Sequence, residues 1–169
     1  AFIPVGGDLK EIEVALPPGL AGNPTAIARC NAQDFNTIHG ELTKEGNASF
    51  NECPGSSVVG IAAVQQLEGA SRISRIPIYN LIPPRGMPAQ FGFEVSGAPL
   101  YINTRVRSDG DYGITAYLHN VTEANRVTAS RISIWGTPWE GSHDPMRGTC
   151  AESQEKICHV EGTPRPFLR

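Results

Sequence analysis

The sequence predicts a mostly β protein: an antiparallel β-sandwich of about seven or more strands, with one short helical segment and long Pro/Gly-rich loops. The chain holds 18 glycines and 14 prolines among 169 residues, and only 18% of its residues are charged. This composition disfavours long amphipathic helices. Short segments of alternating apolar residues, separated by turn signals, are typical of sandwiches rather than of βαβ units. We expect one domain over residues 1–169, with 136–169 a loop-like C-terminal extension packed on it.

The N-terminal third of the chain holds one predicted strand and the helical segment. Residues 9–16 alternate apolar and polar side chains, which predicts a strand that ends at Pro17-Pro18-Gly19. Residues 23–36 form the helical candidate, in which Asn31 can cap a short second turn. Residues 37–52 are polar and contain glycine, so we expect a loop there.

Six further strands are predicted after the cysteine at position 53. Pro77 lies inside the second of them and indicates an edge strand or a bulge, because proline donates no hydrogen bond to a neighbouring strand. Ser108-Asp109-Gly110-Asp111 is a hairpin signal between the fourth and the fifth. The predicted strands are residues 58–65, 72–80, 90–95, 99–107, 112–119 and 126–135.

The four cysteines indicate the compartment. Cys30, Cys53, Cys150 and Cys158 form no CxxC pair and match no zinc-site spacing. An even number of cysteines in a chain rich in glycine and proline favours two disulfides and an extracellular or cell-surface location. Three connectivities remain open; we favour Cys30–Cys53 with Cys150–Cys158, because each pair closes a loop of turn residues. The alternative is four free thiols in a cytosolic protein.

Charge, hydropathy and motifs exclude several classes of function. A net charge of -3 argues against nucleic-acid partners, which select basic surfaces. No apolar run approaches the ~18 residues of a membrane span, so no membrane insertion is expected. The chain has neither a GxSxG elbow nor an HExxH pair, and no cofactor is expected. These absences favour a non-catalytic protein.

Aromatic residues offer one candidate binding site. Trp135 and Trp139 flank a Gly-Thr-Pro turn and could stack on a sugar ring, together with Tyr112. This predicts a carbohydrate-binding module that recognises a surface glycan. The alternative is that one tryptophan closes the end of the core while the other covers a loop.

Two pairs of ionisable residues offer weaker candidates. His143 and Asp144 are adjacent and would suit a secreted hydrolase if a turn joined their side chains; a structural loop is the alternative. Asp109 and Asp111 could hold a cation, although the further oxygen ligands of a calcium loop are missing and a plain hairpin turn is the more common cause of such a pair.

Two further observations concern the surface. The side chains of Glu11 and Glu13 have the spacing of the two catalytic carboxylates of a glycosidase. The alternative is that they lie at alternate positions on the exposed face of a strand, which gives the same spacing. Asn47 and Asn120 match the acceptor pattern for N-glycosylation, which matters for a eukaryotic source.

Five segments between residues 7 and 148 are rich in the prolines, glycines and cysteines that fix turns. They are DLKEIEVALPPGLAGNPTAIARC, CPGSSVVGIAAV, PIYNLIPPRGMPAQFGF, TRVRSDGDYGI and WGTPWEGSHDPMRG. Together they resemble a poorly characterised β-rich module of long secreted and surface proteins of soil actinobacteria. The resemblance implies a secreted or cell-surface module, often part of a longer chain, with no catalytic residues to carry over.

The function that these observations predict is an extracellular structural or adhesive module without catalytic activity. Its partners would be neighbouring modules or identical subunits, which exposed edge strands can engage. Carbohydrate binding through the tryptophans and hydrolysis through His143 and Asp144 are the alternatives.

Overall fold

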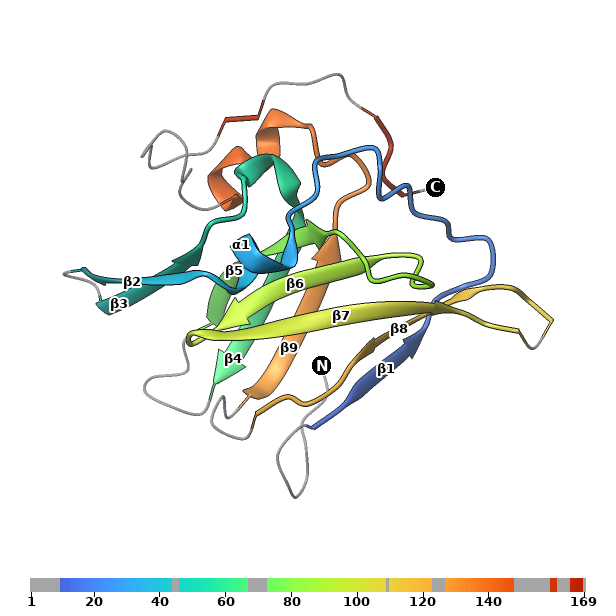
Figure 1. Ribbon diagram of the computed structural model, residues 1–169, viewed down its shortest axis with the longest axis horizontal. Helices are drawn as coiled ribbons and strands as arrows, with labels where there is room; N and C mark the ends of the chain where they lie inside the picture. The colour runs from blue at the N-terminus through green and yellow to red at the C-terminus, as the bar shows by residue number, and fades with distance from the viewer. Residues whose placement is uncertain are drawn as a thin grey trace.

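Seven strands form one antiparallel sheet in the computed structural model, in the order β1-β8-β7-β6-β5-β4-β9 (Figure 1). The structure describes residues 10–43, 46–66, 73–108, 110–122, 127–147, 159–160 and 165–168, and of 41–50 the backbone alone. The strands of this sheet are Ile12–Ala15 (β1), Val58–Gln66 (β4), Ile73–Leu81 (β5), Gln90–Val95 (β6), Ala98–Val106 (β7), Ile114–Leu118 (β8) and Val127–Ile134 (β9).

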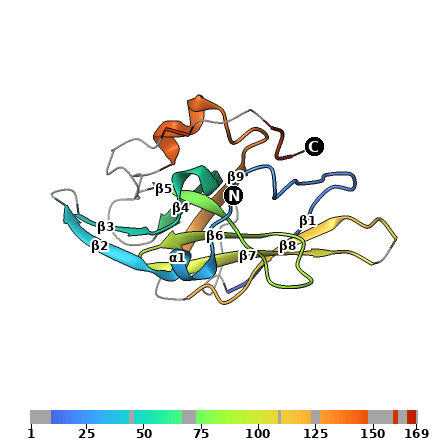
Figure 2. The same ribbon diagram turned by 45° about the horizontal axis from the view of Figure 1, so that its top comes forward.

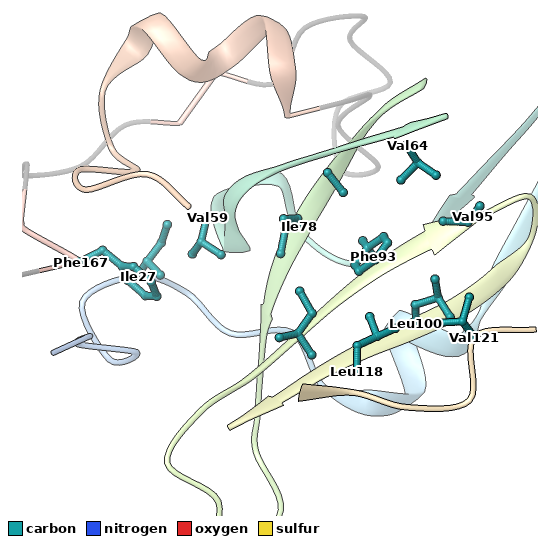
Figure 3. Packing of buried hydrophobic residues seen from close by; sticks show 12 residues of the cluster. Ile27, Val59, Val64, Ile78, Phe93, Val95, Leu100, Leu118, Val121 and Phe167 are labelled. Atoms are coloured by element: carbon teal, nitrogen blue, oxygen red, sulfur yellow. The ribbon is translucent and has the colours of Figure 1, made fainter. Parts of the chain in front are cut away.

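The sheet curls around its own apolar face like half of a barrel (Figure 2). Buried side chains such as Val59, Ile78, Phe93 and Leu118 point into this interior (Figure 3). The predicted mostly β, antiparallel class is therefore confirmed, but a sandwich of two stacked sheets is not. From β4 to β8 each strand pairs with the next one along the chain, so the chain bends one sheet instead of crossing to a second.

Pro77 lies in β5 without breaking the sheet. Along one side β5 pairs with β4 from Val58 to Gln65, and Ile61 lies opposite Pro77. Along its other side β5 pairs with β6 only from Tyr79 to Leu81. Pro77 therefore occupies a part of the strand that is locally an edge, where a missing N–H costs nothing. The expectation of an edge position holds locally, although β5 lies inside the sheet.

The segments before β4 depart from the expectations. Within the helical candidate over residues 23–36, an α-helix forms at Ala32–Asn36 (α1), where the predicted cap is confirmed: Asn31 Oδ1 accepts a hydrogen bond from Asp34 N at 2.8 Å. The preceding residues are turns. The expected loop over 37–52 is wrong, because Ile38–Thr43 (β2) and Gly46–Asn51 (β3) pair along their whole length as a separate hairpin.

A disulfide between Cys30 and Cys53 ties this region to the sheet. The two Cα atoms lie 5.3 Å apart. Cys30 also bonds the end of β5 through its backbone, since its N–H donates to Asn80 O at 2.8 Å and its carbonyl accepts from Ile82 N at 2.9 Å. This predicted disulfide is confirmed, whereas Cys150 and Cys158 lie outside the described residues.

Replacing both Cys30 and Cys53 by alanine is expected to lower the free energy of unfolding by about 3 kcal/mol, the value for constraining a loop of this length in the unfolded chain. The sequence separation is 23 residues. Urea unfolding of the variant and of the wild type measures the difference. Repeating both titrations under reductant is the control: the difference should then shrink sharply. Equal midpoints without reductant would contradict the prediction.

The described part of the C-terminal extension packs against one end of the sheet. A 3₁₀ helix, η3 (Gly141–Met146), lies above β4 and β9 (Figure 1). Phe167 is 1% exposed within the core, and its N–H donates to Gly136 O at 2.7 Å. Within the ranges that the structure describes, no helix combines the length and apolar character needed to cross a bilayer.

Candidate functional site: an apolar trough beside two sheet edges

The concave face of the sheet contains an apolar cavity of about 520 Å³, which we call the trough. Strands β1, β4, β6, β7, β8 and β9 all contribute side chains to its wall. In the described part of the chain no charged side chain lines it. Its wall includes Val14, Ile102, Ala116, Ser130, Ile132 and Phe167.

The trough opens between the two edge strands of the sheet. Among the described residues β1 pairs only with β8, and β9 pairs only with β4. Val14 on β1 and Ile132 on β9 both line the trough, yet they are 48% and 42% exposed. Large apolar side chains in this position, beside strand edges with free backbone groups, mark a surface suited to a partner or ligand.

Strand periodicity explains why these residues line the trough. Ile12, Val14 and Leu16 follow each other at every second position and so point to the same side of the chain. The sequence predicts that this row faces inward. It does not predict the empty volume, because alternation shows which face is apolar and leaves open what covers it.

The two tryptophans both make contacts within the protein. Trp135 is 9% exposed, its ring stacks on His143 with centroids 4.1 Å apart, and the Arg147 guanidinium lies 5.5 Å from its centroid. Trp139 packs against the core and donates its indole N–H to Ala26 O at 3.0 Å. Tyr112 is 77% exposed but belongs to the β7–β8 loop. Trp135 therefore belongs to the buried interior, and Trp139 packs against it.

Among the described residues, the side chains of His143 and Asp144 do not form a hydrogen bond with each other. Asp144 Oδ1 accepts from Arg147 Nε at 3.0 Å, and Asp144 Oδ2 lies 3.1 Å from Nδ1 of His159. His143 instead stacks on Trp135. Sequence reasoning missed the pairing of Asp144 with His159, because the fifteen-residue separation between them matches no recognisable motif.

The electrostatics of this cluster favour an ionised Asp144 and a neutral His143. Partial burial alone would raise the pKa of the Asp144 carboxyl, but hydrogen bonds from Arg147 and His159 outweigh it, and the pKa is lowered. Burial chiefly lowers the pKa of His143 below 6.5. An ionised Asp144 suits Arg147, which is 1% exposed and needs a counter-charge.

The acidic hairpin binds a cationic side chain of the protein itself. Asp111 pairs with Arg107 Nη2 at 2.6 Å and Nε at 3.0 Å, and accepts from Gly113 N at 2.8 Å. The hydrogen bond from Arg107 chiefly lowers the pKa of Asp111 to about 2. Asp109 lies outside the described residues. Within the ranges that are described, no group of three or more His, Cys, Asp or Glu side chains could hold a metal ion.

The remaining candidates lie apart from the trough. Glu11 pairs with His119 at 3.2 Å, and Glu13 pairs with Arg105, so each carboxylate of the predicted pair has its own basic partner on the outer face of the sheet. Asn120 is exposed with a φ of 60°, just after β8, where a glycan would have room. Asn47 belongs to β3, and its side chain is outside the described part.

In comparisons with known proteins, no family model, curated protein or solved structure matches the chain.

Proposed function

We propose that this protein is an extracellular, non-catalytic module that assembles with identical subunits by adding strand to strand at the β9 edge. The single observation that carries the proposal is the open side of the curled sheet. There, in the described part of the chain, an edge strand with free backbone groups borders exposed apolar side chains. Strand addition is a common way for β domains to bind extended partners.

Strand β9 is the better of the two edges for this purpose. It has eight residues, no proline and one charged residue, Arg131, whereas β1 has four residues. Natural proteins protect edge strands with charges, prolines or short length, and β9 has little of that protection. An edge of this kind is expected to pair with another strand.

A second copy of β9 is a chemically suitable partner. Antiparallel pairing about a twofold axis at Ile132 places the two Ile132 side chains opposite each other on the trough side. The same register places Arg131 opposite Ser133, so the two arginines do not face each other. Two identical subunits could therefore pair their free backbone groups without placing like charges opposite each other.

The extracellular location is supported by the Cys30–Cys53 disulfide, because structural disulfides persist in oxidising compartments. The resemblance to actinobacterial surface modules points the same way. A structural or adhesive role follows from assembly without a catalytic constellation. The glycan and hydrolase alternatives have less support, since Trp135 is buried and Asp144 is paired with Arg147.

Light scattering across a concentration series tests the assembly. We expect the average mass of the wild type to rise from one to two chains, whereas Ile132→Lys stays monomeric because it places a charge at the edge contact. Ala129→Lys is the matched control: it adds the same charge on the outer side of β9, and assembly should persist. If the wild type is monomeric at every concentration, the proposed assembly is wrong.

A further inference from the structure

We propose that the trough binds one linear acyl chain of a lipid, with the polar head of the lipid outside the mouth between β1 and β9. This inference goes beyond the proposed assembly and does not depend on it. Assembly uses the backbone edge of β9, whereas the acyl chain would occupy the volume behind that edge. Separate experiments therefore test the two.

The chemistry of the wall selects an apolar guest. In the described residues the trough has no charged side chain, and its few polar ones include Thr104. The Thr104 hydroxyl donates to Ala89 O at 2.6 Å and accepts from Ala89 N at 2.9 Å, so its hydrogen bonds are made within the protein. A sugar or nucleotide would lose its hydrogen bonds to water without replacement, whereas a hydrocarbon loses none.

The volume suits a small ligand rather than solvent. At about 520 Å³ the trough falls within the range of ligand pockets and far exceeds the space of one water molecule. The trough shares part of its wall with the buried core, since Phe93 and Leu118 belong to both. Val59, Ala62 and Ile78, each 0% exposed, belong to the core and do not line the trough. The trough is therefore a space between the core side chains and the open side of the sheet.

The shape suits an extended chain. Ile12 and Val14 on β1 line the trough, as does Leu16 directly after β1. On β9 the lining residues include Ser130, Ile132 and Ile134. Each row covers three successive inward positions, a rise of about 13 Å along the strand. An extended acyl chain can lie along such a slot, and the open mouth lets a polar head stay in water.

Filling the trough would also remove an unfavourable feature of the empty protein. Val14 and Ile132 are large apolar side chains left 48% and 42% exposed. Contact with an acyl chain would bury both, and burial of apolar surface is the main source of affinity for such ligands. The described part of the protein thus provides both a space for the acyl chain and apolar surface whose burial favours binding.

The test is titration with single-chain fatty acids from octanoate to palmitate, at protein concentrations where the chain is monomeric. We expect one fatty acid bound per chain, and an affinity that rises about fourfold for each added methylene until the trough is full. Affinity that is independent of chain length, binding only above the micelle threshold, or tighter binding of a rigid sterol would each overturn the proposal.

Two alanine-to-phenylalanine variants locate the site. Ala116→Phe fills the trough from β8 and should weaken palmitate binding at least tenfold, whereas Ala129→Phe adds the same ring on the outer side of β9 and should bind like the wild type. Equal affinities for the two variants would contradict the location. Because Ala116→Phe changes the interior, its unfolding midpoint is measured in parallel.

A second measurement on the wild type needs no substitution. Methyl NMR spectra with palmitate should show shifts at Val14 and Ile132 and little change at Val59 and Ile78. Shifts confined to residues outside the trough would overturn the proposal. A dimer that fails to form in light scattering would leave this outcome unchanged, so failure of the assembly and failure of the acyl-chain site are distinguishable.

Discussion

Replacing Arg147 by methionine is expected to lower the free energy of unfolding by about 3–5 kcal/mol, the cost of breaking a buried ion pair from one side. The Arg147 side chain is 0% exposed. It donates to Asp144, to Val58 O at 3.3 Å, to Gly55 O at 3.5 Å and to Pro138 O. Methionine fills much of the same space but removes the hydrogen bonds that Arg147 donates to the Asp144 carboxylate and to three carbonyl groups.

The position of Arg147 explains why one side chain has this effect. It follows η3 and reaches the start of β4 as well as the turn after β9, so it joins segments that are 89 residues apart in the chain. Its guanidinium also lies against the ring of Trp135. Arg147 is thus one of the groups that hold the described part of the extension to the sheet, together with Trp139 and Phe167.

Urea unfolding measures the effect, and Arg131→Met is the matched control. Arg131 is exposed on β9, so the same substitution there should change the free energy of unfolding by less than about 0.5 kcal/mol. The double variant Arg147→Met with Asp144→Asn should be more stable than Arg147→Met alone, because no buried carboxylate remains. An Arg147→Met variant as stable as the Arg131→Met control would contradict this role of the ion pair.

The same ion pair predicts how stability depends on acidity. The pKa of Asp144 is lower in the folded protein than in the unfolded chain, where it is about 3.9. Its contribution is therefore complete above the unfolded pKa and is lost as the pH falls through the folded pKa. The lowered pKa of His143 acts in the same direction below 6.5, since the unfolded state binds the proton more readily. In Arg147→Met, the loss of unfolding free energy at low pH that is due to Asp144 should be smaller than in the wild type.

Replacing Phe35 by alanine is expected to cost about 3–5 kcal/mol of unfolding free energy, the range for removing a buried aromatic ring. Phe35 is 1% exposed and joins α1 to the outer face of the sheet. Its ring lies 5.2 Å from that of Tyr101 and 6.2 Å from that of Tyr79. Burial, and then the charge of Glu94, raise the pKa of Tyr79 to about 12, as expected for a phenol enclosed by this cluster.

Gly92 is the reason that Phe35 fits. A Cβ atom at position 92 would lie 2.4 Å from Cζ of Phe35, too close for any contact between carbon atoms. Gly92→Ala should therefore destabilise the wild type by about 1–3 kcal/mol, as overpacking does. In the Phe35→Ala background the added methyl enters the vacated space, and the sign of its effect should reverse.

Thermal or urea unfolding of the four proteins in this cycle measures the coupling between positions 35 and 92. Tyr112→Ala is the control for removal of an aromatic ring, because Tyr112 is 77% exposed and should be nearly neutral. Additive effects of Phe35→Ala and Gly92→Ala would show that the ring and the glycine do not depend on each other, and steric exclusion by Phe35 would then not explain the glycine at position 92.

Local features of the chain were predictable because their causes are local. The alternation of Ile12, Val14 and Leu16, the run at β6 over Gln90–Val95 and the cap at Asn31 each depend on residues a few positions apart. The Cys30–Cys53 disulfide was favoured for a similar reason, since its loop is short and rich in turn residues. By contrast, the alternation in β2 and β3 is weak, because Gly40 separates Ile38 from Leu42 and β3 is mostly small and polar, so the sequence was interpreted as a loop.

The sequence by itself determined the mostly β class of the protein, the alternating apolar rows of strands such as β1, β7, β8 and β9, and the absence of recognised catalytic motifs. Only the tertiary structure decided that one sheet curls instead of two sheets stacking, that a trough remains beside β9, and that Arg147 and His159 are the partners of Asp144. The reason is physical. The alternation of apolar and polar residues shows which face of a strand avoids water, and it depends only on residues close together in the chain. The groups that cover that face come from distant parts of the chain, so alternation does not identify them.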